Sequence, residues 1–168
     1  MGKAEVSIEE DARTNPMGLF NYAHSYWVSA VALQRASLDC THKDAPVDYL
    51  YFHAIELYLK SFLRLRGMTL GQLKKIGHSL TKLHAAAIAE GLTDDEEDRQ
   101  VVALIDQNYM RARYIETGPF SKASPGALWG VCRVFHDEIE PLINRERGVS
   151  RKRSIPYPED DEDEFKFD

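Results

Sequence analysis

The sequence predicts an all-α fold, an antiparallel bundle of about five helices. Apolar residues recur every three or four positions over segments of about 20 residues, and short segments rich in Gly, Pro and Asn separate these segments. No segment alternates apolar and polar residues with the period of two that marks a strand. With 168 residues, of which 43% are hydrophobic, the chain can bury one sizeable core.

Composition divides the chain into three regions. Residues 1–15 are polar without a sustained period, so we expect a flexible N-terminal arm. Residues 16–146 form the helical bundle. Residues 147–168 are basic and then acidic, which predicts a disordered tail; a reversible contact between its acidic block and basic side chains is an alternative.

The first long helix is predicted to begin at Asn15-Pro16, because Asn is a good N-cap and Pro fits the first turn. Its apolar stripe runs to about Leu38. The second is predicted from Pro46 to Gly67, which is the expected C-cap. This second helix is apolar on more than one side, so we expect it at the centre of the bundle.

The later helices are marked by caps. A short helix or turn over 69–76 precedes a helix that Ser79 caps and Gly91 ends. Thr93 is the expected cap of the next helix, which has four acidic residues in its first turn and runs to about Tyr114. Ser124-Pro125 is predicted to start the last one.

Charge and composition exclude several classes of protein. The net charge is −6, with −2 in each of the three regions, so the chain lacks the basic field of a general nucleic-acid binder. No apolar run is long enough to cross a membrane and no signal peptide is recognisable, so we expect no membrane partner and a cytoplasmic protein. Cys40 and Cys132 are expected to be free thiols; no spacing suggests zinc, and no cofactor is predicted.

The second helix carries charged side chains within its apolar sequence. His53, Glu56 and Lys60 follow one another at offsets of three and four, so they share one helix face. Either they form a ligand site, in which Lys60 binds a phosphate and His53 moves a proton, or they form an internal ion pair that positions two helices. A metal would need a further ligand that the sequence does not supply.

Two further groups are candidates for binding. His78 stands where the chain enters a helix, whose free backbone N–H groups could face an anion, although Ser79 is explained as an ordinary N-cap. Four residues lie at the end of a later helix, where the positive charge of arginine interacts favourably with the helix dipole. An arginine there can also contact Glu56 or a phosphate, and Arg together with Tyr is suited to stacking on a nucleobase. The four residues are Tyr109, Arg111, Arg113 and Tyr114.

Three segments together resemble the HEPN domain family: YLYFHAIELYLKSFLRLRG (49–67), GHSLTKL (77–83) and YMRARY (109–114). The resemblance covers about residues 18–145. It implies an antiparallel, HEPN-like helical bundle, usually a homodimer, in toxin–antitoxin, defence or nucleotidyltransferase-associated proteins. Glu56, Lys60, His78, Arg113 and Tyr114 match the polar positions of the non-catalytic branch.

Many HEPN proteins are metal-independent RNases with an R-x(4–6)-H motif late in the core. Here no histidine follows Arg111 or Arg113 at that spacing, and the formal match from Arg35 to His42 stands at the end of the first helix instead. The resemblance therefore implies a non-catalytic module that binds a nucleotide, RNA or a protein partner such as an antitoxin. The alternative is a divergent endoribonuclease that uses Arg111 or Arg113 with His78.

Overall fold

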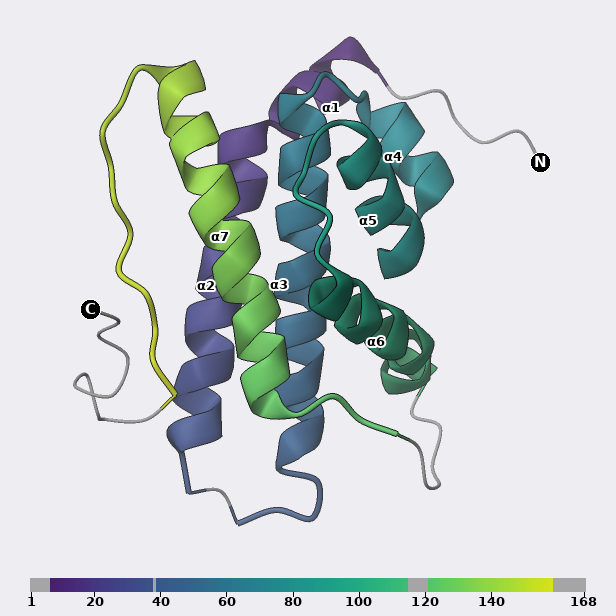
Figure 1. Cartoon of the computed structure of the whole chain (residues 1–168), viewed down its shortest axis with the longest axis vertical. Coiled ribbons are helices and arrows are strands. Elements are labelled where there is room, and N and C mark those ends of the chain that lie inside the picture. Colours follow the sequence, from purple (N-terminus) through teal and green to yellow (C-terminus); the bar gives the residue numbers. More distant parts are fainter. Residues whose placement is uncertain (1–6, 38, 115–120, 159–168) are drawn as a thin grey trace.

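The computed structural model describes residues 7–37, 39–114 and 121–158, without the side chains of Met110 and residues 112–114. The described residues form seven helices and no strand (Figure 1). The all-helical prediction is confirmed, and the two helices beyond the expected five are short. The helices are α1 (Ile8–Arg13), α2 (Pro16–Arg35), α3 (Asp44–Leu65), α4 (Leu70–Ile76), α5 (Leu80–Ala89), α6 (Glu96–Tyr114) and α7 (Pro125–Arg147).

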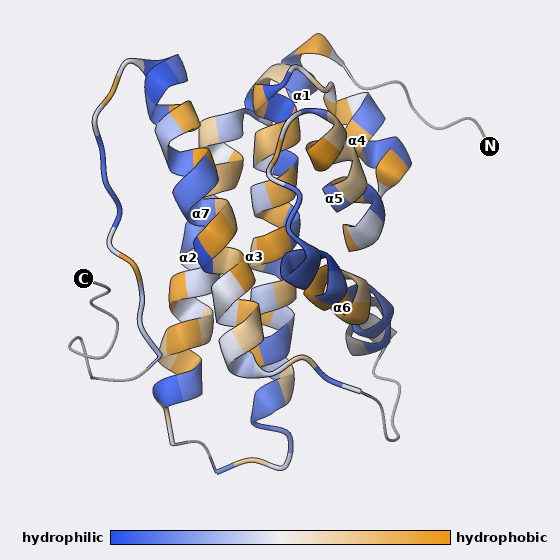
Figure 2. Ribbon diagram, viewed as in Figure 1, coloured by the Kyte–Doolittle hydropathy of each residue, from blue (hydrophilic) through white to orange (hydrophobic). Residues whose placement is uncertain are grey.

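Helix α3 is the centre of the structure, as its apolar sequence predicted. It contacts α2 and α7 on one side and α5 and α6 on the other (Figure 1). Half of its 22 residues are buried, including Tyr51, Tyr58 and Phe62. Hydrophobic segments lie on α3 and on the long helices around it (Figure 2), and their buried apolar residues form one core. None of the described helices has the length and apolar character needed to span a membrane.

The three long helices of the core do not all alternate in direction. Ser61, near the end of α3, donates a hydrogen bond to the carbonyl of Pro16, so α2 and α3 are antiparallel. Lys122, just before α7, pairs instead with Asp48 near the start of α3. Helix α7 therefore runs parallel to α3 and antiparallel to α2 (Figure 1). The chain reaches this arrangement because α4, α5 and α6 intervene between α3 and α7.

Most helix boundaries follow the expected caps. The side chains of Asn15 and Ser124 accept hydrogen bonds from the backbone N–H groups of Gly18 and Ala127, and a proline occupies the first turn of α2 and of α7. Gly67 and Gly91 have φ angles of 91° and 96°, the left-handed region in which glycine carries no side-chain penalty.

The predicted cap of α6 is wrong. The Asp95 carboxylate accepts from the backbone N–H groups of Glu97 and Asp98 and so caps the helix. Thr93 instead donates to the Glu138 carboxylate on α7 from both its backbone N–H and its hydroxyl. Aspartate and threonine are both accepted caps, and the contact with α7 decides between them.

The two terminal regions carry structure that their composition did not predict. Residues 8–13 of the expected flexible arm form α1, and the Arg64 guanidinium binds the Asp11 carboxylate at 3.1 Å and the Asp11 backbone carbonyl at 2.8 Å. Residues 148–158 of the expected disordered tail lie along α2 and α7 (Figure 1). In each case one arginine holds the segment, Arg64 for α1 and Arg153 for the C-terminal segment. Amino-acid composition alone cannot predict such contacts. Residues 1–6 and the acidic block 159–164 lie outside the described residues.

Asp98 is buried in the first turn of α6, where three other carboxylates act on it. Burial, together with Asp95, Glu97 and Glu138, raises the pKa of Asp98 to about 6. An acid whose pKa is higher in the folded state destabilises that state above this pKa. Asp98→Asn is therefore expected to raise the free energy of unfolding by about 1 kcal/mol at pH 7.5 in urea denaturation.

The gain should disappear as the pH falls from 6 to below 3.8, because Asp98 then becomes neutral in both states. Glu90→Gln is the matched control: Glu90 is exposed and is not one of the charges that raise the pKa of Asp98, so its replacement should change stability by less than about 0.5 kcal/mol. A gain for Asp98→Asn that persists unchanged at pH 4 would contradict the electrostatic explanation.

Candidate functional site

A single buried carboxylate, Glu56, links three parts of the fold. Its side chain is 1% exposed, in the middle of α3. The Tyr109 hydroxyl of α6 donates to Glu56 Oε2 at 2.6 Å, and His78 Nδ1, from the connection between α4 and α5, lies 2.8 Å from Oε1. Lys60, one turn along α3, donates to the same Oε1. The carboxylate therefore joins α3 to α6 and to the start of α5.

The surroundings of Glu56 keep it ionised. Its burial raises the pKa, but the neighbouring side chains of His53, Lys60 and Tyr109, together with the positive charge of Lys60, outweigh burial and hold the pKa well below its usual value. Since an ionised carboxylate only accepts hydrogen bonds, His78 must donate to it from Nδ1. The other ring nitrogen of His78, Nε2, is then the one available to a ligand.

The hydrogen bonds also orient His53. Because the Tyr109 hydroxyl gives its only proton to Glu56, it accepts from His53 Nδ1 at 3.1 Å. The His53 ring lies edge-on to the ring of Tyr26, with 4.5 Å between centroids, and stacks on that of Tyr49 at 6.2 Å. The histidine is thus held by one hydrogen bond and two aromatic neighbours.

The polar side chains around Glu56 reach solvent to different extents. The exposed fraction is 16% for Lys60, 25% for His53 and 49% for His78. These three side chains and Tyr109, with Glu56 beneath them, are here called the Glu56 cluster. Its inner end is fixed by hydrogen bonds, while its outer end can contact another molecule.

Five of the eight candidate residues therefore meet: His53, Glu56, Lys60, His78 and Tyr109. Arg111 lies on α6 with its side chain exposed. The side chains of Arg113 and Tyr114 lie outside the described part of the structure, so the predicted contact between Arg113 and Glu56 stays a prediction. This geometry agrees both with a ligand site and with an internal ion pair, because an ion pair that joins helices can also face a ligand.

The predicted anion site at the start of α5 is already filled by the chain. The Asp106 carboxylate on α6 accepts from the backbone N–H of Leu80 at 2.7 Å and from the hydroxyls of Ser79 and Thr81 at 3.1 and 2.5 Å. Ser79 is also the N-cap, as predicted. A carboxylate from another helix thus takes the place that an external anion would need.

Asp106→Ala is expected to lower the free energy of unfolding by about 2 kcal/mol, because it removes three hydrogen bonds to a helix start. Urea denaturation monitored by far-UV circular dichroism measures the loss. Gln107→Ala, at the exposed next position on α6, is the control and should cost less than about 0.5 kcal/mol. Equal losses for the two variants would contradict this role of Asp106.

Two other expectations concern catalytic and metal sites. The formal R-x(6)-H match falls at the connection between α2 and α3, where Arg35 and His42 are both exposed. The first residue of α3, which follows this connection, lies 12 residues before Glu56, or about 18 Å along the helix.

Among the described residues, no group of three His, Cys, Asp or Glu side chains could hold a metal ion. Cys40 and Cys132 are both free, as predicted.

Sequence reasoning missed Tyr26, Tyr49 and Asp106. Tyr49 stands four residues before His53, so its place on the same face of α3 was readable from helical spacing. Tyr26 and Asp106 lie on α2 and α6, and only the packing of these helices against α3 and α5 brings them to the site. No local signal could have identified them.

Comparison of the chain with family models, with curated proteins and with solved structures found no match.

Proposed function

We propose that this chain is a non-catalytic helical binding module of the HEPN type that holds a nucleotide or a segment of RNA at the Glu56 cluster. The observation that carries the proposal is the convergence of Lys60, His53 and His78 on one buried carboxylate while all three keep an exposed surface. Homodimerisation and a protein partner such as an antitoxin follow from the family resemblance alone and belong to the same proposal. A cytoplasmic location also belongs to it and is expected from the sequence, because the sequence shows no membrane span and no signal peptide.

The chemistry of the cluster suits a nucleotide better than a small uncharged ligand. The rings of Tyr49 and His53 stack on each other at an interplanar angle of 13°, and aromatic rings of this kind also stack on nucleobases. Lys60 offers N–H donors to a phosphate, and His78 Nε2 offers an acceptor to the edge of a base. Arg111, exposed on α6, adds positive charge to the same helix that supplies Tyr109.

The fixed geometry also favours binding. Lys60 and His78 share one oxygen of Glu56, so each has lost much of its side-chain freedom before a ligand arrives. A preorganised site loses less entropy on binding than a flexible one. Replacing the buried carboxylate should therefore weaken binding as well as stability.

Thermal-shift measurements of the full chain against the four common ribonucleoside monophosphates and short single-stranded RNAs test the proposal. A ligand at 100 times its Kd stabilises the folded state by about 2.7 kcal/mol, which raises the Tm by several degrees. The Lys60→Met variant should lose this shift. Lys82→Met, which removes an exposed lysine of α5, is the matched control and should keep it.

The outcomes are distinct. A Tm shift that survives Lys60→Met would show that the ligand binds elsewhere, and the absence of a shift with any of these ligands would refute nucleotide binding. If Lys60→Met changes only the stability of the free protein, the cluster is a structural ion pair.

One observation favours a second function, a divergent metal-independent RNase. The hydrogen bond between Glu56 and His78 Nδ1 leaves His78 Nε2 free to accept a proton, which is how a carboxylate orients a histidine that acts as a general base. Such a base would take the proton of an RNA 2′-hydroxyl as it attacks the adjacent phosphate. Arg111 or Arg113 would stabilise the added negative charge.

Incubation of the full chain with a labelled single-stranded RNA in EDTA tests this alternative. Cleavage that yields 2′,3′-cyclic phosphate ends in the wild type and falls at least about 100-fold in His78→Ala would establish it. His42→Ala, which removes an exposed histidine away from the cluster, is the control and should cleave like the wild type. Binding of RNA without cleavage would leave the non-catalytic function.

A further inference from the structure

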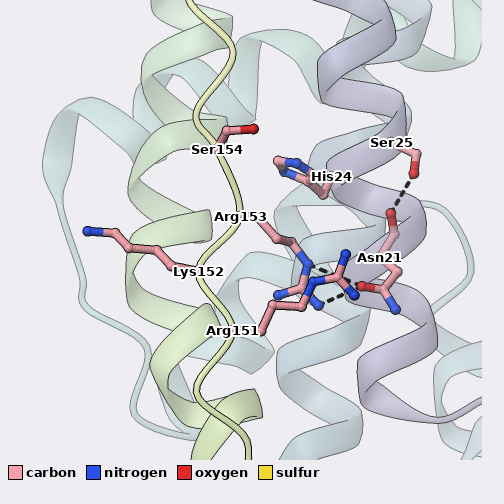
Figure 3. Close-up of a pocket in the computed structure, with 7 residues that line it drawn as sticks. All are labelled: Asn21, His24, Ser25, Arg151, Lys152, Arg153 and Ser154. Carbon is pink, nitrogen blue, oxygen red and sulfur yellow. Dashed lines mark hydrogen bonds between the residues drawn. The ribbon is translucent and has the colours of Figure 1, made fainter.

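A second polar site lies on the other side of α3, between α2 and the segment that follows α7. A pocket of about 500 Å³ opens there (Figure 3). It is built from three residues of α2 and four consecutive residues of the C-terminal segment: Asn21, His24, Ser25, Arg151, Lys152, Arg153 and Ser154. None of these residues belongs to the Glu56 cluster.

The lining is suited to an anion. All seven residues carry a hydrogen-bond donor and none is acidic, although the chain as a whole has a net charge of −6. Figure 3 shows the guanidinium groups of Arg151 and Arg153 approaching one another beside Asn21, whereas Lys152 points away. Two cations at close range raise the local positive potential unless carboxylates balance both.

One of the two arginines is a fixed part of the structure. Arg153 is 7% exposed; its guanidinium binds the Glu140 carboxylate at 2.9 Å and the Asn21 side-chain oxygen at 2.6 Å, and lies over the Phe20 ring at 4.7 Å from its centroid. Arg151 differs, because within the described residues its guanidinium has no ion-pair partner. Its charge is the one that a ligand can neutralise.

His24 adds a polar atom without a partner. Its Nδ1 is buried at the pocket and forms no hydrogen bond within the described residues. Burial lowers the pKa of His24 to about 4, with His136, Arg153 and Arg151 lowering it further against the opposing effect of Glu140. The ring is therefore neutral at pH 7; with the buried Nδ1 unprotonated, Nε2 carries the N–H that can donate to an oxygen in the pocket. Ser154 also faces the ring (Figure 3).

We propose that this pocket binds a phosphate group, with Arg151, His24 and Ser154 as its donors and the Arg153–Glu140 pair as its rigid base. A phosphate fits better than a carboxylate because its three or four oxygens can accept from all three donors at once. The site is independent of the proposed nucleotide function, since it shares no residue with the Glu56 cluster.

Isothermal titration calorimetry of the full chain with inorganic phosphate and with glycerol 3-phosphate, at pH 7.5 and constant ionic strength, tests the proposal. Arg151→Gln should weaken binding at least about tenfold, because it removes the charge-assisted contact. Arg151 is exposed, so this variant keeps the fold. Arg147→Gln, which removes an exposed arginine from the end of α7 outside the pocket, should bind within twofold of the wild type.

Tighter binding of glycerol 3-phosphate than of phosphate would identify a phosphomonoester as the ligand, and equal binding would identify free phosphate. The acidic block 159–164 of the chain could compete for the same pocket, so a variant with these six residues changed to their amides is titrated as well. Binding that appears or tightens in this variant supports the site. Absence of binding in both proteins, or equal binding by wild type and Arg151→Gln, overturns it.

Discussion

Glu56→Gln is expected to lower the free energy of unfolding by about 3 kcal/mol at pH 7. The substitution keeps the shape of the side chain but removes the charge that Lys60 and His78 share, and breaking a buried pair by removing one partner is strongly destabilising. The Tyr109 hydroxyl can still donate to the amide oxygen of glutamine. The loss of stability therefore measures mainly the effect of the negative charge and not that of this hydrogen bond. Urea denaturation at equilibrium provides the measurement.

The same variant has a defined pH dependence. Since the folded-state pKa of Glu56 lies below its ordinary value of 4.5, its contribution to stability is complete above that pH and is lost as the pH falls through the folded-state pKa. The difference between wild type and Glu56→Gln should therefore be constant from pH 7 to about 5.5 and shrink in stronger acid.

Glu10→Gln is the matched control for Glu56→Gln. Glu10 also pairs with a lysine, Lys74, but both side chains are about half exposed, so the loss should be less than about 0.5 kcal/mol. Equal losses at the two positions would contradict the role given to burial. A difference between wild type and Glu56→Gln that grows in acid would contradict the lowered pKa.

Arg153→Met is expected to cost about 3 kcal/mol and to release the C-terminal segment from α2 and α7. Methionine fills a similar length, but it leaves the Glu140 carboxylate buried without its counter-ion and removes both bonds to Asn21. The segment would then keep weaker ties, among them the backbone N–H of residue 153 to Glu140, Asn144 to the carbonyl of Arg151, and the Trp129 indole to the carbonyl of Pro156. Urea denaturation gives the energy, and amide hydrogen exchange of residues 149–157 reports the release.

Lys152→Met, at the next position along the segment, is the control. Lys152 is exposed, so its replacement should change stability by less than about 0.5 kcal/mol and leave hydrogen exchange unaltered. If Arg153→Met is as stable as Lys152→Met, or if its segment exchanges like that of the wild type, the buried pair does not hold the segment.

Much of the fold could be predicted because its signals are local. The caps Asn15, Ser79 and Ser124 and the glycines at 67 and 91 act within a few residues of the boundaries they set. The central place of α3 also followed from its own sequence, since a helix that is apolar on several sides must be covered on several sides. The cap of α6 was misassigned because a contact with Glu138 on another helix engages Thr93.

The candidate site was predictable only in part. Spacing along one helix placed His53, Glu56 and Lys60 on one face, and these three do meet. Whether Glu56 would be buried, and which of its neighbours would donate to it, depended on how α6 and the start of α5 pack against α3. The same packing placed Asp106 where an external anion had been expected.

By itself, the sequence determined that this chain is helical, where α2 and α7 begin, and which charged residues share a face of α3, because helical periodicity and capping are short-range properties of the backbone. Only the tertiary structure decided that Glu56 is a junction of three elements, that α7 runs parallel to α3, and that Arg153 holds the C-terminal segment against the bundle. The physical reason is that burial and ion pairing depend on residues far apart in the chain: Arg153 and Asn21 are 132 positions apart, and no local pattern records such a pair.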